Sequence, residues 1–70
     1  MDFSEALKVM RMGNKVSREA WRGTIAYYEI AQEPHTHADV IRRFRPDGTD
    51  VIVSGISADD ILADDWWIVT

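Results

Sequence analysis

The chain has 70 residues, no cysteine and a formal net charge of −4; all eight Lys and Arg lie in residues 1–45, and residues 46–70 carry only acidic charges. This composition excludes disulfides and thiolate metal sites, disfavours binding to DNA or RNA, and bounds the chain to one small domain, residues 1–70. No apolar run approaches the ~20 residues that cross a bilayer and no signal peptide is visible, so we expect no membrane insertion and a cytoplasmic location.

The first predicted element is an amphipathic helix over residues 3–12. Asp2 followed by Glu5 is typical of a capping box that opens a helix. Gly13 then supplies a left-handed residue that ends it. Four apolar residues recur at helical spacing and should form the buried stripe: Phe3, Ala6, Leu7 and Met10.

The next segment predicts a short turn and a strand. Residues 15–17 are too few for more than an edge strand or a bridge. Residues 17–20 can form a single helical turn that delivers Trp21. Residues 24–30 are rich in β-branched and aromatic side chains and alternate as a strand does, with Tyr28 on the inward face together with Ala26 and Ile30.

The middle of the chain predicts a loop followed by a hairpin. Residues 32–39 are polar and contain a proline, which indicates a loop. Residues 40–45 alternate apolar and charged side chains. Pro46-Asp47-Gly48-Thr49 is a strong turn signal, and the apolar residues 51–53 follow it directly, so the two runs should pair.

The final segment predicts a capped helical turn and a closing strand. Ser57 or Asp59 can cap a short turn that runs to Leu62. Trp66 and Trp67 then open a strand, where neighbouring side chains point to opposite faces, so both cannot enter the same core. We therefore expect an α+β fold, with one N-terminal amphipathic helix packed on a small antiparallel sheet of four or five strands.

Size and charge distribution also bear on assembly. At this length a hydrophobic core rarely supplies more than ~3–5 kcal/mol, and almost half of the residues are apolar. Part of that surface should be buried between subunits, and one of the paired tryptophans should lie in a subunit interface or line a pocket. We expect a homo-oligomer, a dimer or a tetramer.

Trp21 supports two hypotheses. In small domains a tryptophan usually anchors a helix to a sheet. The alternative is a stacking platform for a nucleobase, which is favoured by its neighbours: Arg22 can pair with phosphate oxygens, and Gly23 allows close backbone approach to a ligand.

Two clusters could hold a metal, although capping and solvation explain them better. The acidic turn at residues 59–65 has oxygen ligands but lacks the glycine-centred loop of a calcium site. His35 and His37 lie in a polar loop without a clear third ligand. No metal, cofactor or catalytic residue is expected, because no nucleophile elbow, phosphate loop or HExxH motif is present.

Three stretches together carry a family resemblance: FSEAL at residues 3–7, REAWRG at 18–23 and DILADDW at 60–66. In this order they resemble the second type of Thoeris anti-defence protein of phages. The resemblance implies a sponge in an infected bacterial cell that sequesters a host immune signal of the glyco-cyclic ADP-ribose type without degrading it. It also places Ser57 and Asp60 near the ligand, where a carboxylate can accept hydrogen bonds from ribose.

The combined set of predicted ligand-binding residues is Trp21, Arg22, Gly23, Tyr28, Ser57 and Asp60. The chain departs from the family at Arg22, where asparagine is common, and at residues 53–55, where the usual Pro-Trp is missing. Arg18, Arg22 and the arginines of residues 42–45 are the candidate cations for a phosphorylated ligand. The alternative function is a protein-binding inhibitor of a host defence effector or nuclease; a nucleotide-degrading enzyme is a weaker rival.

Overall fold

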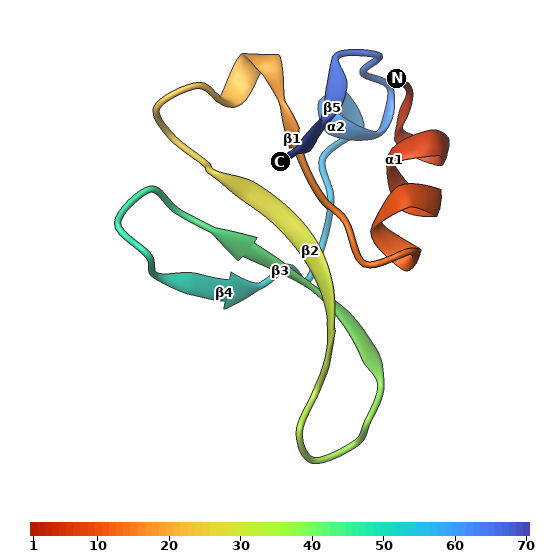
Figure 1. The fold of residues 1–70 in the computed structure, drawn as a ribbon, viewed down its shortest axis with the longest axis vertical. Coiled ribbons are helices and arrows are strands. Elements are labelled where there is room, and N and C mark those ends of the chain that lie inside the picture. The colour runs from red at the N-terminus through yellow and green to blue at the C-terminus, as the bar shows by residue number, and fades with distance from the viewer.

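The computed structural model describes residues 1–70 as one antiparallel sheet with helices at one end. The five strands run in the order β4-β3-β2-β1-β5. Figure 1 shows α1 and α2 beside β1 and β5, while the β2–β3 hairpin extends away from them. The elements are α1 (Phe3–Arg11), β1 (Lys15–Arg18), the 3₁₀ turn η1 (Glu19–Trp21), β2 (Tyr27–Gln32), β3 (Asp39–Phe44), β4 (Asp50–Ile52), α2 (Ala58–Ile61) and β5 (Trp66–Val69). The α+β fold expected from the sequence is confirmed.

Helix α1 forms where the sequence predicts it and ends one residue earlier. The Asp2 carboxylate accepts a hydrogen bond from the Glu5 amide at 2.8 Å, which caps the helix. The chain turns out of the helix at Gly13, which has a φ of +94°, a conformation that favours glycine. Ala6 and Met10 are buried against the sheet. The apolar stripe is therefore what fixes α1 to the strands.

Strand β1 corrects the prediction of an edge strand or bridge at residues 15–17. It lies inside the sheet, where Val16 is in register with Tyr28 of β2 on one side and with Ile68 of β5 on the other. Val16 is fully buried. The shortness of β1 predicted an edge strand, but β5, from the other end of the chain, pairs with the edge of β1 that β2 leaves free. The two strands lie far apart in the sequence, so local pattern did not predict that they pair.

Strand β2 also begins later than the predicted residue 24. After η1, the amides of Thr24 and Ile25 both donate to the Trp21 carbonyl, at 2.9 and 3.2 Å. These bonds tighten the chain into a turn, so β2 starts only at Tyr27. The inward position of Tyr28 is retained.

The hairpin predicted around residues 46–49 is confirmed. Gly48 has a φ of +89°, and the Asp47 carboxylate accepts a hydrogen bond from the Thr49 amide at 2.9 Å. Strands β3 and β4 pair on either side of this turn, each shifted by one residue from its predicted start. The polar loop between β2 and β3 spans residues 33–38, and His37 there has a φ of +61°.

The two faces of the sheet differ. Trp66 is only 2% exposed on the face covered by α1, whereas Trp67 is 43% exposed. The opposite orientations expected for the two tryptophans are thus confirmed. On the uncovered face Tyr27 and Phe44 stack at a ring-centroid distance of 4.6 Å. This uncovered face combines exposed aromatic surface with charged residues.

An aromatic cluster forms the core. Trp66 contacts Trp21 edge to face at 5.0 Å between centroids, and Phe3 at 5.3 Å. Tyr28 lies 4.6 Å from Trp21. The Trp66 indole donates a 2.9 Å hydrogen bond to the Asp60 carbonyl. Three of the six buried hydrophobic residues are therefore aromatic: Trp21, Tyr28 and Trp66.

Trp66→Ala should unfold the domain, and Trp67→Ala should not. Removing a buried tryptophan costs about 3–5 kcal/mol, which equals the whole stability a core of this size supplies. An exposed substitution usually stays within about 0.5 kcal/mol. Far-ultraviolet circular dichroism and thermal melting of both variants test this. Equal melting temperatures would contradict the assignment of Trp66 to the core.

Candidate functional site

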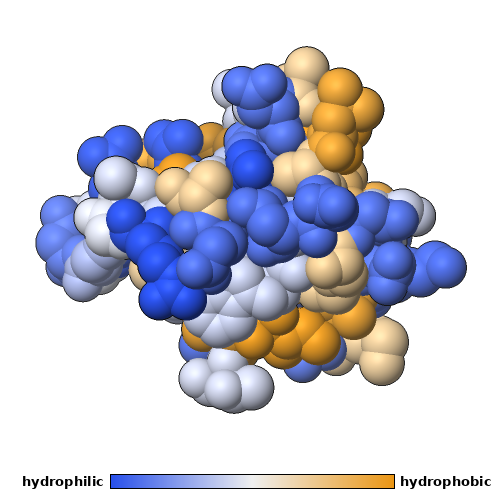
Figure 2. All heavy atoms as spheres, turned by 90° about the horizontal axis from the view of Figure 1, so that it is seen from above, coloured by the Kyte–Doolittle hydropathy of each residue, from blue (hydrophilic) through white to orange (hydrophobic).

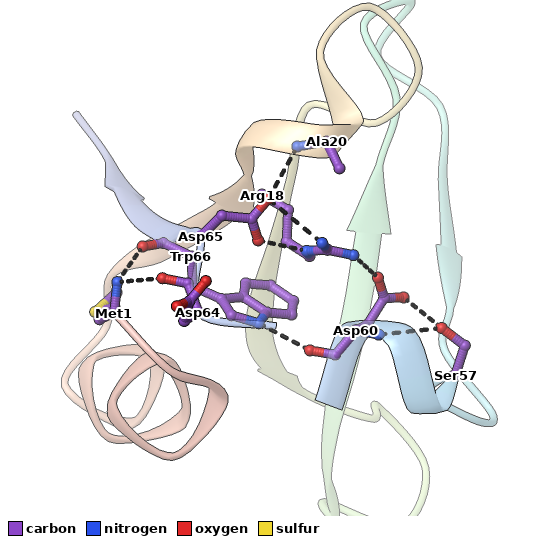
Figure 3. Close-up of polar contacts among 8 residues, drawn as sticks. All are labelled: Met1, Arg18, Ala20, Ser57, Asp60, Asp64, Asp65 and Trp66. Atoms are coloured by element: carbon purple, nitrogen blue, oxygen red, sulfur yellow. Dashed lines mark hydrogen bonds and ion pairs between the residues drawn. The ribbon is translucent and has the colours of Figure 1, made fainter. Parts of the chain in front are cut away.

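Arg18 organises a polar corner where β1 leads into η1. Its Nη1 atom lies 2.6 Å from Asp60 Oδ1, and its Nε atom lies 2.7 Å from Asp65 Oδ1. The Arg18 side chain is only 14% exposed. Figure 3 shows the guanidinium between the two carboxylates, which come from α2 and from the residue before β5. We call these three residues the Arg18 network.

The Arg18 network extends into backbone and capping hydrogen bonds. Asp65 Oδ2 accepts from the Ala20 amide at 3.2 Å, which holds η1 in place. Ser57 caps α2: its hydroxyl accepts from the Asp60 amide and lies 3.0 Å from Asp60 Oδ2. The network therefore connects β1 and the start of β5 with η1 and α2, which hold the predicted site residues Trp21 and Asp60.

Hydrogen bonding sets the charge state of this corner. The bond from Arg18 is the main cause that lowers the pKa of Asp65 below its usual value, and the Ala20 amide adds to it. The two carboxylates in turn raise the pKa of Arg18, the Asp65 bond most strongly. One guanidinium and two carboxylates leave the Arg18 network with a net charge of −1, so it offers no free cation to an anion.

Tyr28 lies beside this network and beside Arg43. The two residues are direct cross-strand partners in the β2–β3 ladder, so their side chains share a face. Burial is the main cause that raises the pKa of Tyr28; the Asp60 charge acts in the same direction and Arg43 opposes it. Arg43 lies beside Tyr28 in the ladder, and Asp60 and Tyr28 both contact Trp66: the Asp60 carbonyl accepts from the indole nitrogen, and the Tyr28 ring lies 6.0 Å from the Trp66 ring.

The structure brings some of the predicted site residues together. Asp60 accepts a hydrogen bond from the Ser57 hydroxyl, its charge helps to raise the pKa of Tyr28, and the Tyr28 ring packs at a tilt against Trp21. Trp21 is 7% exposed within the aromatic cluster, as the first of its two hypotheses states. Trp21 thus packs beneath Tyr28 as part of the core, and most of its ring surface is covered by the protein.

Arg22 and Gly23 lie apart from α2, at the exposed end of η1. The Arg22 guanidinium is 76% exposed and forms a two-pronged pair with Glu19, at 2.6 and 3.0 Å. Gly23 has a φ of +84°, and no other part of the protein lies within 4 Å of where a side chain would begin. Their hydrogen bonds do not reach Ser57 or Asp60, but the space around both is open.

Two surface depressions occur elsewhere on the domain. One, of about 200 Å³, lies between α1 and the β2–β3 hairpin, and the other, of about 510 Å³, lies between the start of α1 and residues 61–64. Neither is lined by any of the six predicted ligand-binding residues. A single chain therefore does not enclose a ligand at those residues.

Other candidate chemistry is sparse. His35 and His37 are exposed, and no three His, Asp or Glu side chains lie close enough to hold a metal ion. None of the helices has the length and apolar character needed to span a membrane.

Sequence reasoning missed the pairing of Arg18 with Asp60 and Asp65, and the position of Arg43. The available signal was the uneven distribution of charge: all eight Lys and Arg lie before residue 46, and only acidic residues carry charge after it. That asymmetry predicts attraction between the two parts of the chain without identifying the pairs.

The fold and this corner define a small α+β domain that presents hydroxyl, carboxylate and guanidinium groups beside an aromatic core. Residues 1–69 match the family model described as the Tad2-like, Thoeris anti-defense 2-like domain. The chain belongs to this family, as the sequence resemblance indicated. A search of curated proteins finds no match. Membership implies a role in Thoeris anti-defence, through a signal molecule or a defence component.

Asp65→Asn should lower the melting temperature at neutral pH and flatten its decline in acid. The folded pKa of Asp65 is below its unfolded value, so its contribution is complete above the unfolded pKa of about 4 and disappears as pH falls through the folded one. Asp59→Asn is the matched control, because Asp59 is exposed on α2 and makes no ion pair. Thermal melts from pH 7 to pH 2 test this; parallel curves for wild type and Asp65→Asn would refute it.

Proposed function

We propose that this domain binds and sequesters a host immune signalling nucleotide of the cyclic ADP-ribose type, and so prevents activation of the downstream effector. The observation that carries the proposal is the convergence of Ser57, Asp60 and Tyr28 at the corner fixed by Arg18. Hydroxyl and carboxylate groups can form hydrogen bonds with ribose hydroxyls, and a guanidinium beside them can pair with phosphate. Family membership supports the same class of function.

Arg22 and Gly23 form the second part of the proposed site. Exposed ion pairs contribute only about 0–1 kcal/mol, so a phosphate can displace Glu19 from Arg22 at little expense. The open space at Gly23 admits a ligand close to the backbone. In this proposal Trp21 acts mainly by holding Tyr28 and η1 in position, with only its exposed edge left for the ligand.

We propose that the domain acts without catalysis. A general base needs a carboxylate that is free to take a proton. Asp60 and Asp65 are both held by Arg18, and the lowered pKa of Asp65 makes it a weaker base. Sequestration instead works by mass action, which requires the domain to be abundant and to bind more tightly than the effector does.

We also propose a homo-oligomer in the cytoplasm of the infected cell. The uncovered sheet face carries Trp67, which is 43% exposed, and the stacked pair Tyr27 and Phe44. Figure 2 shows hydrophobic side chains in separate patches among hydrophilic ones on the face that it draws. A second copy would cover such surface and give walls to a site that one chain leaves open. The exposed large apolar residues are Met12, Val51, Ile52, Ile61, Leu62, Trp67 and Ile68.

The alternative function, a protein-binding inhibitor, is favoured by one observation. Leu62 is 82% exposed beside the depression of about 510 Å³, where Ile61 also lies. Exposed apolar surface next to a groove is typical of a protein-binding face. Leu62→Asp would remove inhibition of a defence effector in that case, and would leave nucleotide binding intact in the case that we favour.

A release assay separates the function classes. The protein should deplete a candidate cyclic ADP-ribose signal from solution, and heating to unfold the protein should return the signal unchanged, as measured by liquid chromatography and mass spectrometry. Recovery of breakdown products would indicate an enzyme. A failure to deplete the signal would favour the protein-binding inhibitor.

Arg22→Ala should weaken binding of that signal by about ten- to a hundredfold, because charge-assisted hydrogen bonds contribute about 1–3 kcal/mol. The loss should shrink as ionic strength rises, since salt screens an exposed charge. Arg11→Ala removes the same charge from α1 and should have little effect. Calorimetric titrations at low and high salt test this; equal losses for both variants would show that only net charge matters.

A further inference from the structure

Arg43 differs from the other five arginines of the chain. Arg18, Arg22 and Arg42 each have a carboxylate partner, at 2.6, 2.6 and 2.7 Å. Arg11 and Arg45 are exposed to solvent. Arg43 is partly buried, forms no ion pair, and its buried Nε atom has no hydrogen-bond partner.

A guanidinium in this condition is unfavourable in the unliganded protein. Water no longer solvates its buried nitrogen, and no protein group replaces that water. Such unsatisfied groups are uncommon in folded proteins, and each one calls for an explanation, of which a partner supplied by a bound ion is one. The charge of Arg43 is therefore available to an anion that approaches its terminal nitrogens.

Asp60 does not pair with Arg43. Its Oδ1 atom accepts from Arg18 at 2.6 Å, and its Oδ2 atom accepts from the Ser57 hydroxyl at 3.0 Å. Arg43 is therefore left without a carboxylate partner.

We propose that Arg43 is a phosphate-binding residue of this domain in addition to Arg22, and that it receives a phosphate or pyrophosphate group beside the Tyr28 hydroxyl. This rests on the proposed function and deepens it. Arg43 and Tyr28 lie side by side as cross-strand partners, so the cation and the hydroxyl donor reach the same anion. The planar guanidinium presents paired donors to phosphate oxygens, and lysine does not reproduce this geometry.

The test measures binding of inorganic pyrophosphate and of ADP-ribose by calorimetry. Arg43→Gln should lower both affinities by about ten- to a hundredfold, and Arg43→Lys should restore only part of the loss. Arg45→Gln is the matched control, because it removes the same charge from an exposed position just beyond β3. It should change either affinity by less than about threefold.

Thermal melting of the same variants separates binding from folding. Arg43→Gln should melt at or above the wild-type temperature, because it removes an unsatisfied buried charge. If Arg43→Gln does not fold, Arg43→Met keeps a similar side-chain length without the charge and takes its place. A folded, uncharged variant that binds pyrophosphate like the wild type overturns the inference, and so do equal losses for Arg43→Gln and Arg45→Gln.

The inference and the proposed function fail in different ways. If wild type binds pyrophosphate through Arg43 but does not deplete a cyclic ADP-ribose signal, the phosphate site stands and the proposed function falls. If wild type depletes the signal and Arg43→Gln does so equally well, the proposed function stands and the Arg43 inference falls. Absence of any binding of pyrophosphate and ADP-ribose by wild type at millimolar concentration also overturns the Arg43 inference.

Discussion

Trp66 connects the core to α2, because its ring and its indole nitrogen contact different parts of the domain. The ring packs against Phe3 of α1 and Trp21 of η1, while the nitrogen donates to the Asp60 carbonyl of α2. An indole buried without that acceptor would be unfavourable. The position of α2 is therefore coupled to the core, because the same residue, Asp60, accepts from Trp66 with its carbonyl and from Arg18 with its carboxylate.

The parts of the fold that depend on local pattern could be predicted from the sequence. The periodicity that begins at Phe3 predicts α1, and the turn chemistry at residues 46–49 predicts the hairpin, because neighbouring residues decide both. The place of β1 could not be predicted, because its partner β5 lies about fifty residues away and a short strand carries no mark of its neighbours. The position of β1 in the sheet depends on its tertiary pairing with β5.

In the candidate site, too, the local features could be predicted from the sequence and the long-range pairings could not. Ser57 caps α2 as its sequence position predicts, since capping depends on residues within one turn. The pairing of Arg18 with Asp60 and Asp65 joins residues more than forty positions apart, so charge composition predicts only an attraction. Trp21 illustrates the remaining difficulty: the same residue type serves a core and a stacking platform, and only burial separates the two.

The pairing of β1 with β5 has a consequence for synthesis on the ribosome. Strand β1 is made early, but one of its edges remains unpaired until residues 66–69 emerge. The growing chain then exposes an unsatisfied strand edge and an incomplete aromatic core, which are features that promote aggregation. The sheet can therefore be completed only after the last strand of the domain has been made.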